Sequence, residues 1–598
     1  MTEPWERRFT APMIAQVRWA PGVPDRLGVV STESGRSQAW AWDLTTGERR
    51  QASDDGVGAE EVHVTPDGAS VVWWLDPIGD ERGRWMQTSF AGGDPRPLLP
   101  DAPDGWMAGL SMVPGAIAAG YSTDEGYLIY LAHDGGPAEL RYRHMRPAGV
   151  GLEWPQGPGG LSVDATLLCI RHAEDGDIAH MALRVMDARS GVTIAELRDE
   201  DRTVAPAGWS PVPGDQRLIV IREVDGIEQP WCWDLGNATL EPIACELPGA
   251  LFLEDWYPDG SALLLRQDHR ARDALVRFDL RDSSTSVVVP AAGTITQASI
   301  RPDGHLWYRT ENGVHAPRIL SETGQEMVRI PDAPSAPDGH PCEDVWFDNP
   351  HGDRIQGWLK RPNGPGPHPT IVSVHGGPEY HDTDLFDPRE QAYVDHGFAV
   401  LSVNYRGSTG YGRAFREAIH GNIGFPESED VNAGLDHLVT QGIADPERLF
   451  IEGWSWGGYL ATLNAGLHPE RWRAVLAGIP VGDYVAAHYE CAPPLREWDL
   501  ATLGGSPMDL PELYRERNPM TYVDQVRAPM LLIAGEHDSR CPLGQVMTYA
   551  HALRARGREV DVHLYAGGHH ANDVDEQIAH VRLAMDFFIR HMDAPATD

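Results

Sequence analysis

Gly453–Gly458 reads Gly-Trp-Ser-Trp-Gly-Gly and is the most informative segment for the fold of this chain. It follows a short apolar run, Leu449–Ile451, of the kind that forms a buried strand, and it precedes Tyr459–Thr462, which begins a helical pattern. A glycine–X–serine–X–glycine sequence between a strand and a helix predicts a sharp turn whose flanking positions leave no room for side chains. The turn lifts Ser455 to the edge of a sheet, where the N-terminus of the following helix favours negative charge. We therefore expect Ser455 to be a nucleophile.

The chain around this turn alternates apolar strands with helical segments. Strands are expected at Thr370–Val374, Phe398–Asn404, Arg448–Glu452, Ala474–Ile479, Met530–Ala534 and Val560–Tyr565. Helices are expected at Asp430–Thr440 and Gly458–Leu467. Such alternation predicts a mostly parallel, doubly wound sheet with helices on both faces. Together with the serine turn, it indicates an α/β-hydrolase fold for the C-terminal part of the chain.

The sequence from about Trp19 to Ile330 has a different character. Short apolar runs are separated by Gly, Pro and Asp, and long helical periodicity is missing, which predicts an all-β region. Turns of the Pro-Asp-Gly kind, such as Pro66–Gly68, recur with a period of about 40 to 50 residues. They mark seven units that start near residues 18, 60, 108, 158, 206, 252 and 296, each with room for about four strands.

Seven four-stranded units predict a seven-bladed β-propeller, in which radial repetition leaves only short edges. A pair of β-sandwiches is the alternative, and the even spacing of the turns disfavours it. Residues 331–341 are rich in Pro, Ala, Asp and Gly and are expected to form a linker. The predicted domains are residues 1–335, which hold an N-terminal segment and the propeller, and residues 336–598, the α/β-hydrolase domain.

A serine hydroxyl needs a base before it can attack a carbonyl carbon. In an α/β-hydrolase the partners follow the nucleophile in the order Asp, then His, each at the carboxyl end of a strand. Asp538 comes just after the strand expected at Met530–Ala534, and two adjacent histidines, His569 and His570, come just after the last strand. Asp538 would orient the imidazole and stabilise its charged form, and one of the two histidines would carry the proton.

The oxyanion of an acyl-transfer intermediate needs hydrogen-bond donors. One expected donor is the backbone N–H of Trp456, the residue after the nucleophile. The second should come from the loop after an early strand, where Gly376 and Gly377 let the backbone approach a substrate. An ordinary turn is the alternative role for this His-Gly-Gly-Pro sequence.

Four motifs together resemble the prolyl oligopeptidase family, and within it the acylaminoacyl-peptidase and dipeptidyl-peptidase branches. They are His375–Pro378, Asn404–Gly412, Gly453–Tyr459 and Asp538–Pro542. The run Asn404–Gly412, which reads Asn-Tyr-Arg-Gly-Ser-Thr-Gly-Tyr-Gly, is the most specific of the four. The motif resemblance covers about residues 340–595, and the propeller resembles the family only at the level of fold.

The resemblance implies roles for further residues. The family's histidine lies in a Tyr-Pro-X-X-X-His-Gly segment, and a gapless reading from Tyr565 favours His570 over His569. In the family, the arginine two positions after the catalytic aspartate binds a substrate carbonyl, which implies that role for Arg540. A specificity pocket is implied between about Val481 and Leu503. Tyr484 and Trp498 are its aromatic candidates, with core packing as the alternative role of each.

The resemblance also implies an activity. A member of this family is expected to be a serine peptidase that cleaves short peptides through an acyl-enzyme, with the propeller limiting access to the site, and it needs no cofactor. An esterase or amidase for a small aminoacylated natural product is an alternative, because the chemistry is the same. A catalytically inactive interaction protein built on the propeller is another, and the complete set of Ser, Asp and His argues against it.

Composition excludes several classes of partner. The net charge of −39 disfavours nucleic acid and anionic membrane surfaces. No apolar run of about 18 residues exists, so no membrane span is expected. Met1–Thr10 lacks a signal-peptide pattern, which predicts a cytoplasmic protein. None of the six cysteines forms a Cys-X-X-Cys pair, so no metal site is expected. Many members of the family assemble through the hydrolase domain, so the resemblance allows a homo-oligomer.

Overall fold

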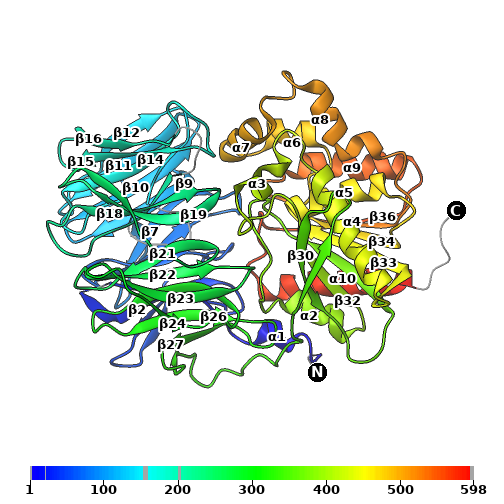
Figure 1. Ribbon diagram of the computed structural model, residues 1–598, viewed down its shortest axis with the longest axis horizontal. Coiled ribbons are helices and arrows are strands. Elements are labelled where there is room, and N and C mark those ends of the chain that lie inside the picture. Colours follow the sequence, from blue (N-terminus) through cyan, green and yellow to red (C-terminus); the bar gives the residue numbers. More distant parts are fainter. Residues whose placement is uncertain (1–2, 21, 152–158, 200–203, 593–598) are drawn as a thin grey trace.

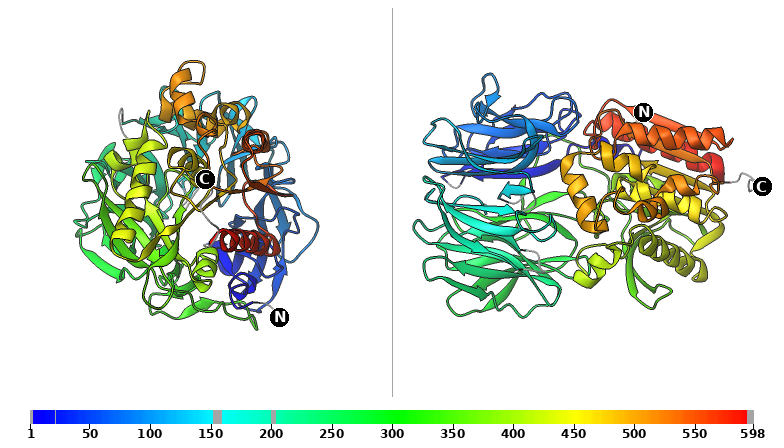
Figure 2. Two further views of the ribbon diagram at one scale, coloured as in Figure 1. Left: turned by 90° about the vertical axis from the view of Figure 1, so that its right-hand side faces the viewer. Right: turned by 90° about the horizontal axis from the view of Figure 1, so that it is seen from above.

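The computed structural model describes residues 3–20, 22–151, 159–199 and 204–592. Figure 1 shows two bodies side by side, a stack of small sheets formed by the first half of the chain and a helix-covered sheet formed by the second half. The two further views in Figure 2 show the same division. No helix among the described residues is long and apolar enough to cross a membrane.

The N-terminal body consists, within the described residues, of seven consecutive sets of four antiparallel strands. The sets begin with β1 (Ile14–Ala20), β5 (Val62–Val64), β9 (Gly105–Val113), β13 (Ala148–Val150), β17 (Val204–Trp209), β21 (Ala250–Trp256) and β25 (Thr294–Ile300). Pairing of β7 (Arg82–Ser89) with β9 joins the second and third sets into one sheet. The expected all-β region of small sheets is therefore confirmed, and the predicted Pro-Asp-Gly turns form as expected. At Pro66–Gly68, the Gly68 N–H donates to the Thr65 carbonyl at 2.7 Å.

Apolar clusters hold each set against the next. Val30 of the first set packs with Val62 of the second, and six further clusters of this kind join the successive sets. One of them brings the seventh set back to the first, because Trp307 packs against Val17. The Gln297 side chain strengthens this last junction by accepting a hydrogen bond from the Val17 N–H at 3.3 Å.

The C-terminal body is built on one eight-stranded sheet with the strand order β29-β30-β32-β31-β33-β34-β35-β36. The strands are β29 (Glu343–Asp348), β30 (Arg354–Lys360), β31 (His368–Val374), β32 (Ala399–Asn404), β33 (Ala444–Trp454), β34 (Ala474–Gly478), β35 (Met530–Gly535) and β36 (Val560–Tyr565). The first two pairings along this order are antiparallel and the others are parallel. This is the doubly wound sheet that the sequence predicts, and all six expected strands are present.

Helices cover both faces of this sheet because the strand residues are apolar on both sides. On one face lie α4 (Phe425–Thr440), α5 (Trp456–Leu467) and α9 (Leu543–Ala555). On the other lie α2 (Pro388–Asp395) and α10 (Val574–Met592). Adjacent residues of one strand therefore enter different cores: Val372 packs with the first group of helices and Ile371 with the second.

The two bodies are connected at two places in the chain. Residues 331–341 run from β28 (Glu326–Val328) to β29, where the sequence predicts a linker. The first described residues belong with the second body, because α1 (Arg7–Thr10) lies against α10. Trp5 and Phe9 are buried in the α2–α10 core, and Arg8 forms an ion pair with Asp395 at 2.5 Å. The chain therefore links the N-terminal body to the C-terminal body both before its first strand and after its last strand.

Candidate active site

Ser455 lies in the turn between β33 and α5 in a strained backbone conformation, with φ 57° and ψ −118°. Its N–H donates to the Gly478 carbonyl of the neighbouring strand at 2.9 Å. The two flanking glycines are required by space. A Cβ on Gly453 would lie 2.2 Å from the Gly457 carbonyl oxygen, and one on Gly457 would lie 1.9 Å from the Val374 carbonyl oxygen. The turn that the sequence predicts around Ser455 is therefore present.

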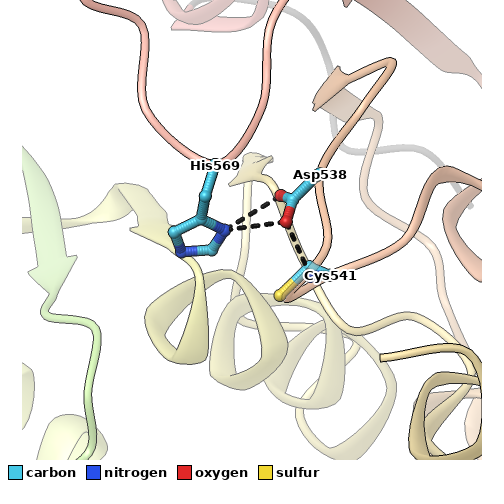
Figure 3. Close-up of side chains that lie close together, drawn as sticks. All are labelled: Asp538, Cys541 and His569. Carbon is cyan, nitrogen blue, oxygen red and sulfur yellow. Dashed lines mark hydrogen bonds and ion pairs between the residues drawn. The ribbon is translucent and has the colours of Figure 1, made fainter. Parts of the chain in front are cut away.

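His569 bridges Ser455 and Asp538. Its Nε2 lies 3.0 Å from the Ser455 Oγ, and its Nδ1 lies 2.9 Å from the Asp538 Oδ2. Asp538 follows β35 and His569 follows β36, so the three residues come from the carboxyl ends of three parallel strands. Figure 3 shows the Asp538 carboxylate and the His569 ring turned toward each other. Both side chains are almost fully buried, which strengthens the electrostatic interaction between them.

The Asp538 carboxylate is fixed in its ionised form. Burial alone would raise its pKa, but the charge and hydrogen bond of His569 lower it, and the N–H groups of Cys541 and Arg540 donate to Asp538 Oδ1 at 2.8 Å each. The result is a pKa below the ordinary value of 3.8. The thiol of Cys541 stays protonated beside this group, because burial raises its pKa well above the usual range.

The family resemblance favours His570 as the base, whereas His569 is the histidine that lies within hydrogen-bonding distance of both Ser455 and Asp538. The His570 ring is exposed on the wall of a cavity and makes an angle of 84° with the ring of His569. Adjacent residues of an irregular loop point in different directions, so only one of the pair can face Ser455. The gapless reading failed because the loop turns one residue early. The Gly567 N–H bonds to the Tyr565 carbonyl at 2.9 Å, and Gly568 accepts from the Tyr565 hydroxyl at 2.6 Å.

The two predicted sources of oxyanion donors flank Ser455. Trp456 is the first residue of α5, and the first N–H groups of a helix have no partner within the helix. Gly376 lies across the turn, where an added Cβ would be 3.4 Å from the Ser455 Cβ. Gly377 follows with φ 123°, a conformation that favours glycine.

His375 links the glycine loop near Ser455 to the run Asn404–Gly412. Its Nε2 bonds to the Ser408 Oγ at 2.9 Å, and its ring stacks on Tyr405 at 4.1 Å. Burial lowers the pKa of His375 to about 3, so this histidine is neutral and serves as a structural hydrogen-bonding group. The Tyr405 hydroxyl also donates to the His375 carbonyl at 2.8 Å. The run Asn404–Gly412 thus supports the glycine loop that faces Ser455.

The three predicted substrate-binding residues have different surroundings. The Arg540 Nε donates to Glu81 Oε1 at 2.8 Å, so its guanidinium is paired with the N-terminal body. Tyr484 is buried and donates its hydroxyl to Asp499 at 2.9 Å. Trp498 packs at 5.3 Å from the ring of Trp456. Neither aromatic residue is among the described residues that line the large cavity beside His569.

Sequence reasoning missed the loop Asp76–Glu81 of the N-terminal body. Asp76 shapes it by accepting from the N–H groups of Gly79 and Glu81 at 2.7 and 2.8 Å. The loop rests directly on the histidine loop, because a Cβ on Gly79 would lie 2.6 Å from the Gly568 nitrogen. Glu81 lies 459 residues before Arg540, and no local pattern in the sequence points to this contact.

A cavity of about 630 Å³ lies between the two bodies at this point. The C-terminal body contributes His569, His570 and Arg540 to its lining. The N-terminal body contributes carboxylates from Glu60, Glu61, Asp76 and Glu81 and aromatic surface from Trp74, Trp106 and Tyr127. The lining as described holds four carboxylates against two guanidinium groups, those of Arg171 and Arg540.

The fold and the site are those of an α/β-hydrolase: a mostly parallel sheet holds a hydrogen-bonded serine, histidine and aspartate at its carboxyl edge and faces the small sheets of the N-terminal body. Residues 385–595 match the model of the Prolyl oligopeptidase family. This part of the chain is therefore similar to that family of serine peptidases.

Individual relatives are similar to the C-terminal part of the chain in the same way. The chain is 33% identical over 210 residues to the acylamino-acid-releasing enzyme of Mus musculus, which covers 34% of this chain and 28% of that one. It is 28% identical over 234 residues to the uncharacterized peptidase YuxL of Bacillus subtilis, which covers 38% of this chain and 35% of the relative. The chain thus matches about a third of the length of these curated relatives.

Solved structures resemble the whole chain. A crystal structure of puromycin hydrolase covers 100% of this chain and 97% of its own, with a TM-score of 0.81 and 19% identity. The acylaminoacyl peptidase of Pyrococcus horikoshii covers 100% and 99%, with a TM-score of 0.71 and 16% identity. At these identities the likeness shows the fold of both bodies.

Proposed function

We propose that this chain is a serine peptidase that hydrolyses short peptides or aminoacyl amides through an acyl-enzyme formed on Ser455. The observation that carries the proposal is the pair of hydrogen-bonding distances at His569, 3.0 Å to the Ser455 Oγ and 2.9 Å to the Asp538 Oδ2. One imidazole within reach of both a hydroxyl and a buried carboxylate is the arrangement that nucleophilic catalysis by serine needs.

The proton moves through His569. Its Nε2 takes the proton of the Ser455 hydroxyl as the Oγ bonds to the substrate carbonyl carbon, and Asp538 stabilises the resulting imidazolium through Nδ1. The imidazolium then gives this proton to the leaving amine as the carbon–nitrogen bond breaks. In the second half, His569 takes a proton from water, the water oxygen attacks the acyl carbon, and Ser455 regains its hydrogen as the acid product leaves.

The negative oxygen of each tetrahedral intermediate would be held by backbone donors. The N–H of Trp456 at the start of α5 and an N–H from the Gly376–Gly377 turn lie on the two sides of Ser455. The positive end of the α5 dipole adds to this stabilisation. Loss of a single such donor in comparable sites costs about 10²- to 10³-fold in kcat.

We further propose that the N-terminal sheets are the blades of a seven-bladed β-propeller, which together with the N-terminal segment makes up residues 1–335. We propose that this body limits access to the hydrolase domain at 336–598. Apolar clusters that link each set of strands to the next, including the seventh to the first, support the propeller. The cavity between the bodies supports the restriction, because His569 is among the residues that line it. Short or unstructured peptides fit such a space, and folded proteins do not.

The charges of the cavity favour a substrate with a free amino group. Glu60, Glu61 and Asp76 line the same cavity as His570, and Glu81 is paired with Arg540. An ammonium group entering this space would meet an excess of carboxylates, whereas an acetylated amine would gain nothing from them. Hydrogen bonds to charged groups contribute about 1.5 to 3 kcal/mol, so a free amine should raise kcat/KM by about tenfold or more.

The proposal is tested with matched substrates and one variant. Wild-type protein and Ser455→Ala are assayed with free and N-acetylated peptide anilides and are labelled with a fluorophosphonate probe. The wild type should accept the label, cleave anilides and prefer the free amine, and Ser455→Ala should do none of these. Hydrolysis at an unchanged rate by Ser455→Ala, or no labelling of folded wild type, would disprove the mechanism. A preference for the acetylated substrate would disprove only the assignment of substrate class.

A second candidate function uses the same site on small molecules. The whole-chain likeness to puromycin hydrolase concerns the fold, but the enclosed acidic cavity also suits an aminoacyl amide of a small natural product. The ratio of kcat/KM for aminoacyl anilides to that for peptidyl anilides separates the two. A ratio well above one favours the small-molecule amidase.

A further inference from the structure

A second cluster of ionisable side chains lies outside the site described above, where β36 meets α10. It consists of His563 on β36 with Glu576 and His580 on α10. The His563 Nε2 and the His580 Nε2 each lie 3.0 Å from the same carboxylate oxygen, Glu576 Oε1. The three ligand atoms all lie within 4.8 Å of one another.

The contact of the His580 Nε2 with Glu576 is an ion-pair distance that lacks hydrogen-bond geometry. His563 forms a hydrogen bond with Glu576, but the contact of the His580 Nε2 with the same oxygen does not have hydrogen-bond geometry. Among the described residues, this nitrogen has no other hydrogen-bond partner, although its side chain is only 5% exposed. A buried polar atom that is left unsatisfied costs about 1–3 kcal/mol, so its persistence calls for an explanation.

A metal ion would explain the arrangement. Zinc binds imidazole nitrogen and carboxylate oxygen at about 2.0–2.2 Å, which separates neighbouring ligand atoms by about 3.3 Å in a tetrahedral site. The two separations of 3.0 Å between the histidine nitrogens and Glu576 Oε1 differ from that value by a few tenths of an ångström, and the two nitrogens lie within 4.8 Å of each other. Small side-chain rotations can supply these differences. Glu576 and His563 are each about one-third exposed, so solvent can supply a fourth ligand and an entry path.

The two imidazoles converge on one carboxylate. The rings of His563 and His580 are 5.4 Å apart, and each has a nitrogen 3.0 Å from Glu576 Oε1. Two neutral imidazoles and a carboxylate form a donor set that suits zinc, copper, nickel and cobalt better than magnesium or calcium.

We propose that His563, Glu576 and His580 form a binding site for a divalent transition metal of the zinc class. The site joins β36 to α10 on either side of the loop that carries His569. The ring of His580 also packs at 4.9 Å from Tyr565 and 5.6 Å from Trp454, the residue before the serine. The bound metal fixes the base of the catalytic loop without touching a reacting atom. The absence of Cys-X-X-Cys pairs, from which the sequence predicts no metal, does not bear on a site of this kind.

The Asp538–Cys541–His569 cluster in Figure 3 is the competing position for a metal. Its groups are already used: Asp538 accepts from His569 and from two backbone N–H groups, and the thiol is protonated. A metal there would have to break the contact between Asp538 and His569. This position would therefore reveal itself by inhibition and by a sulfur ligand.

The test uses the full-length protein after removal of metals by a chelator, titrated with zinc chloride in a calorimeter. One zinc should bind per chain and raise the melting temperature, and magnesium chloride should do neither. Glu576→Gln and His563→Ala should each weaken zinc binding by about tenfold or more. His551→Ala is the matched control, because His551 is an exposed histidine on α9 and should leave zinc affinity unchanged. Unchanged affinity in both ligand variants would refute the site.

Two further measurements keep the proposal open to refutation if a variant does not fold. X-ray absorption of the zinc-loaded wild type should show nitrogen and oxygen ligands and no sulfur. Cys541→Ser should bind zinc as the wild type does. A sulfur ligand, or loss of binding in Cys541→Ser alone, would assign the metal to the Asp538–Cys541–His569 cluster and overturn the proposal.

Discussion

At the scale of single residues, the chemistry depends on which of two adjacent imidazoles faces Ser455. His569 is buried and lies within hydrogen-bonding distance of both Ser455 and Asp538, whereas the ring of His570 faces the cavity. The two residues are chemically identical and adjacent in the chain. Alanine substitutions at the two positions therefore form a matched pair, because the two side chains differ only in the direction in which they point.

Replacement of His569 by alanine should lower kcat/KM for a peptide anilide by about 10³-fold or more, because Ser455 loses its base. His570→Ala should change it by less than about tenfold, since the ring makes no contact with Ser455 or Asp538. Steady-state kinetics of both variants, with fluorophosphonate labelling as a second readout, make the comparison. Equal losses in the two variants would contradict the assignment of His569.

His375 predicts a pH dependence of stability. Its pKa is about 3 in the folded protein and 6.5 as the ordinary value, so the unfolded chain binds a proton more readily between these limits. The contribution of neutral His375 is fully present above pH 6.5 and is lost progressively as the pH falls, by about 1.4 kcal/mol per pH unit. Free energies of unfolding of wild type and His375→Gln, measured from pH 6.5 downward, should converge. Parallel pH profiles would show that His375 does not titrate as described.

The residues that sequence reasoning could identify are those whose position follows from backbone geometry. Ser455 and the glycines around it are fixed by a turn that admits no side chain, and Asp538 is fixed by the end of a strand. The choice between His569 and His570 depends on where a short loop turns, and this loop also packs against Gly79 of the other body. That contact joins residues that are far apart in the chain, so no short stretch of sequence indicates it.

At the scale of elements, one loop joins the two bodies next to the catalytic residues. The loop Asp76–Glu81 lies between β6 (Ser70–Leu75) and β7 and is shaped by backbone hydrogen bonds to Asp76. It presses on the backbone of Gly568 and pairs with Arg540 through Glu81. Arg540 and His569 belong to the loops after β35 and β36, so this element supports two of the loops that form the site.

Gly79→Ala should therefore reduce activity. The added methyl group would lie 2.6 Å from the Gly568 nitrogen and would displace the loop that carries His569. A misplacement of about 1 Å can cost about 10²-fold in rate, so kcat should fall by tenfold or more. Kinetic assays with a small ester, which enters the cavity easily, separate this effect from substrate access.

Gly47→Ala is the matched control for this substitution. Gly47 also has a positive φ, 75° against 96° for Gly79, but an added Cβ there would meet nothing within 4 Å. Both variants should lose about 1 kcal/mol of stability from backbone strain, and only Gly79→Ala should lose activity. Similar kinetics in the two variants would show that the contact with Gly568 does not support the histidine loop.

The elements themselves were largely predictable. The expected strand Val560–Tyr565 has the same bounds as β36, and the helix expected at Asp430–Thr440 begins five residues earlier in the structure, at Phe425. Both follow from strong apolar periodicity. The repeat of Pro-Asp-Gly turns also placed the units of the sheet region. The short α1 was not foreseen, because four residues carry too little periodicity and its burial depends on α10.

At the scale of the whole molecule, the protein carries a net charge of −39, and the cavity between its two bodies is also acidic. Charges of one sign around an enclosed site raise the local concentration of oppositely charged substrates. This effect is screened by salt, because the Debye length shortens from about 30 Å at 0.01 M to about 3 Å at 1 M. Cationic substrates should therefore be favoured most at low ionic strength.

The salt dependence can be measured directly. For a peptide anilide with an added arginine, kcat/KM should fall several-fold between low and high salt. For a single charge the fall should be about one order of magnitude at most. The same peptide with citrulline in that position should show little change, because it has the same shape without the charge. Equal salt dependence of the two substrates would exclude long-range attraction as a factor in substrate capture.

Biosynthesis separates the two halves of the contact between α1 and α10. Glu6 and Arg582, which form an ion pair in this contact, are 576 residues apart in the chain. At about 5 to 20 residues per second, the ribosome delivers them roughly half a minute to two minutes apart. Trp5 and Phe9 must wait through this interval without their pocket, while the intervening small sheets can already fold. The contact between α1 and α10 therefore forms last during synthesis. A nascent chain stalled before α10 would still expose the rings of Trp5 and Phe9, which a chaperone could bind.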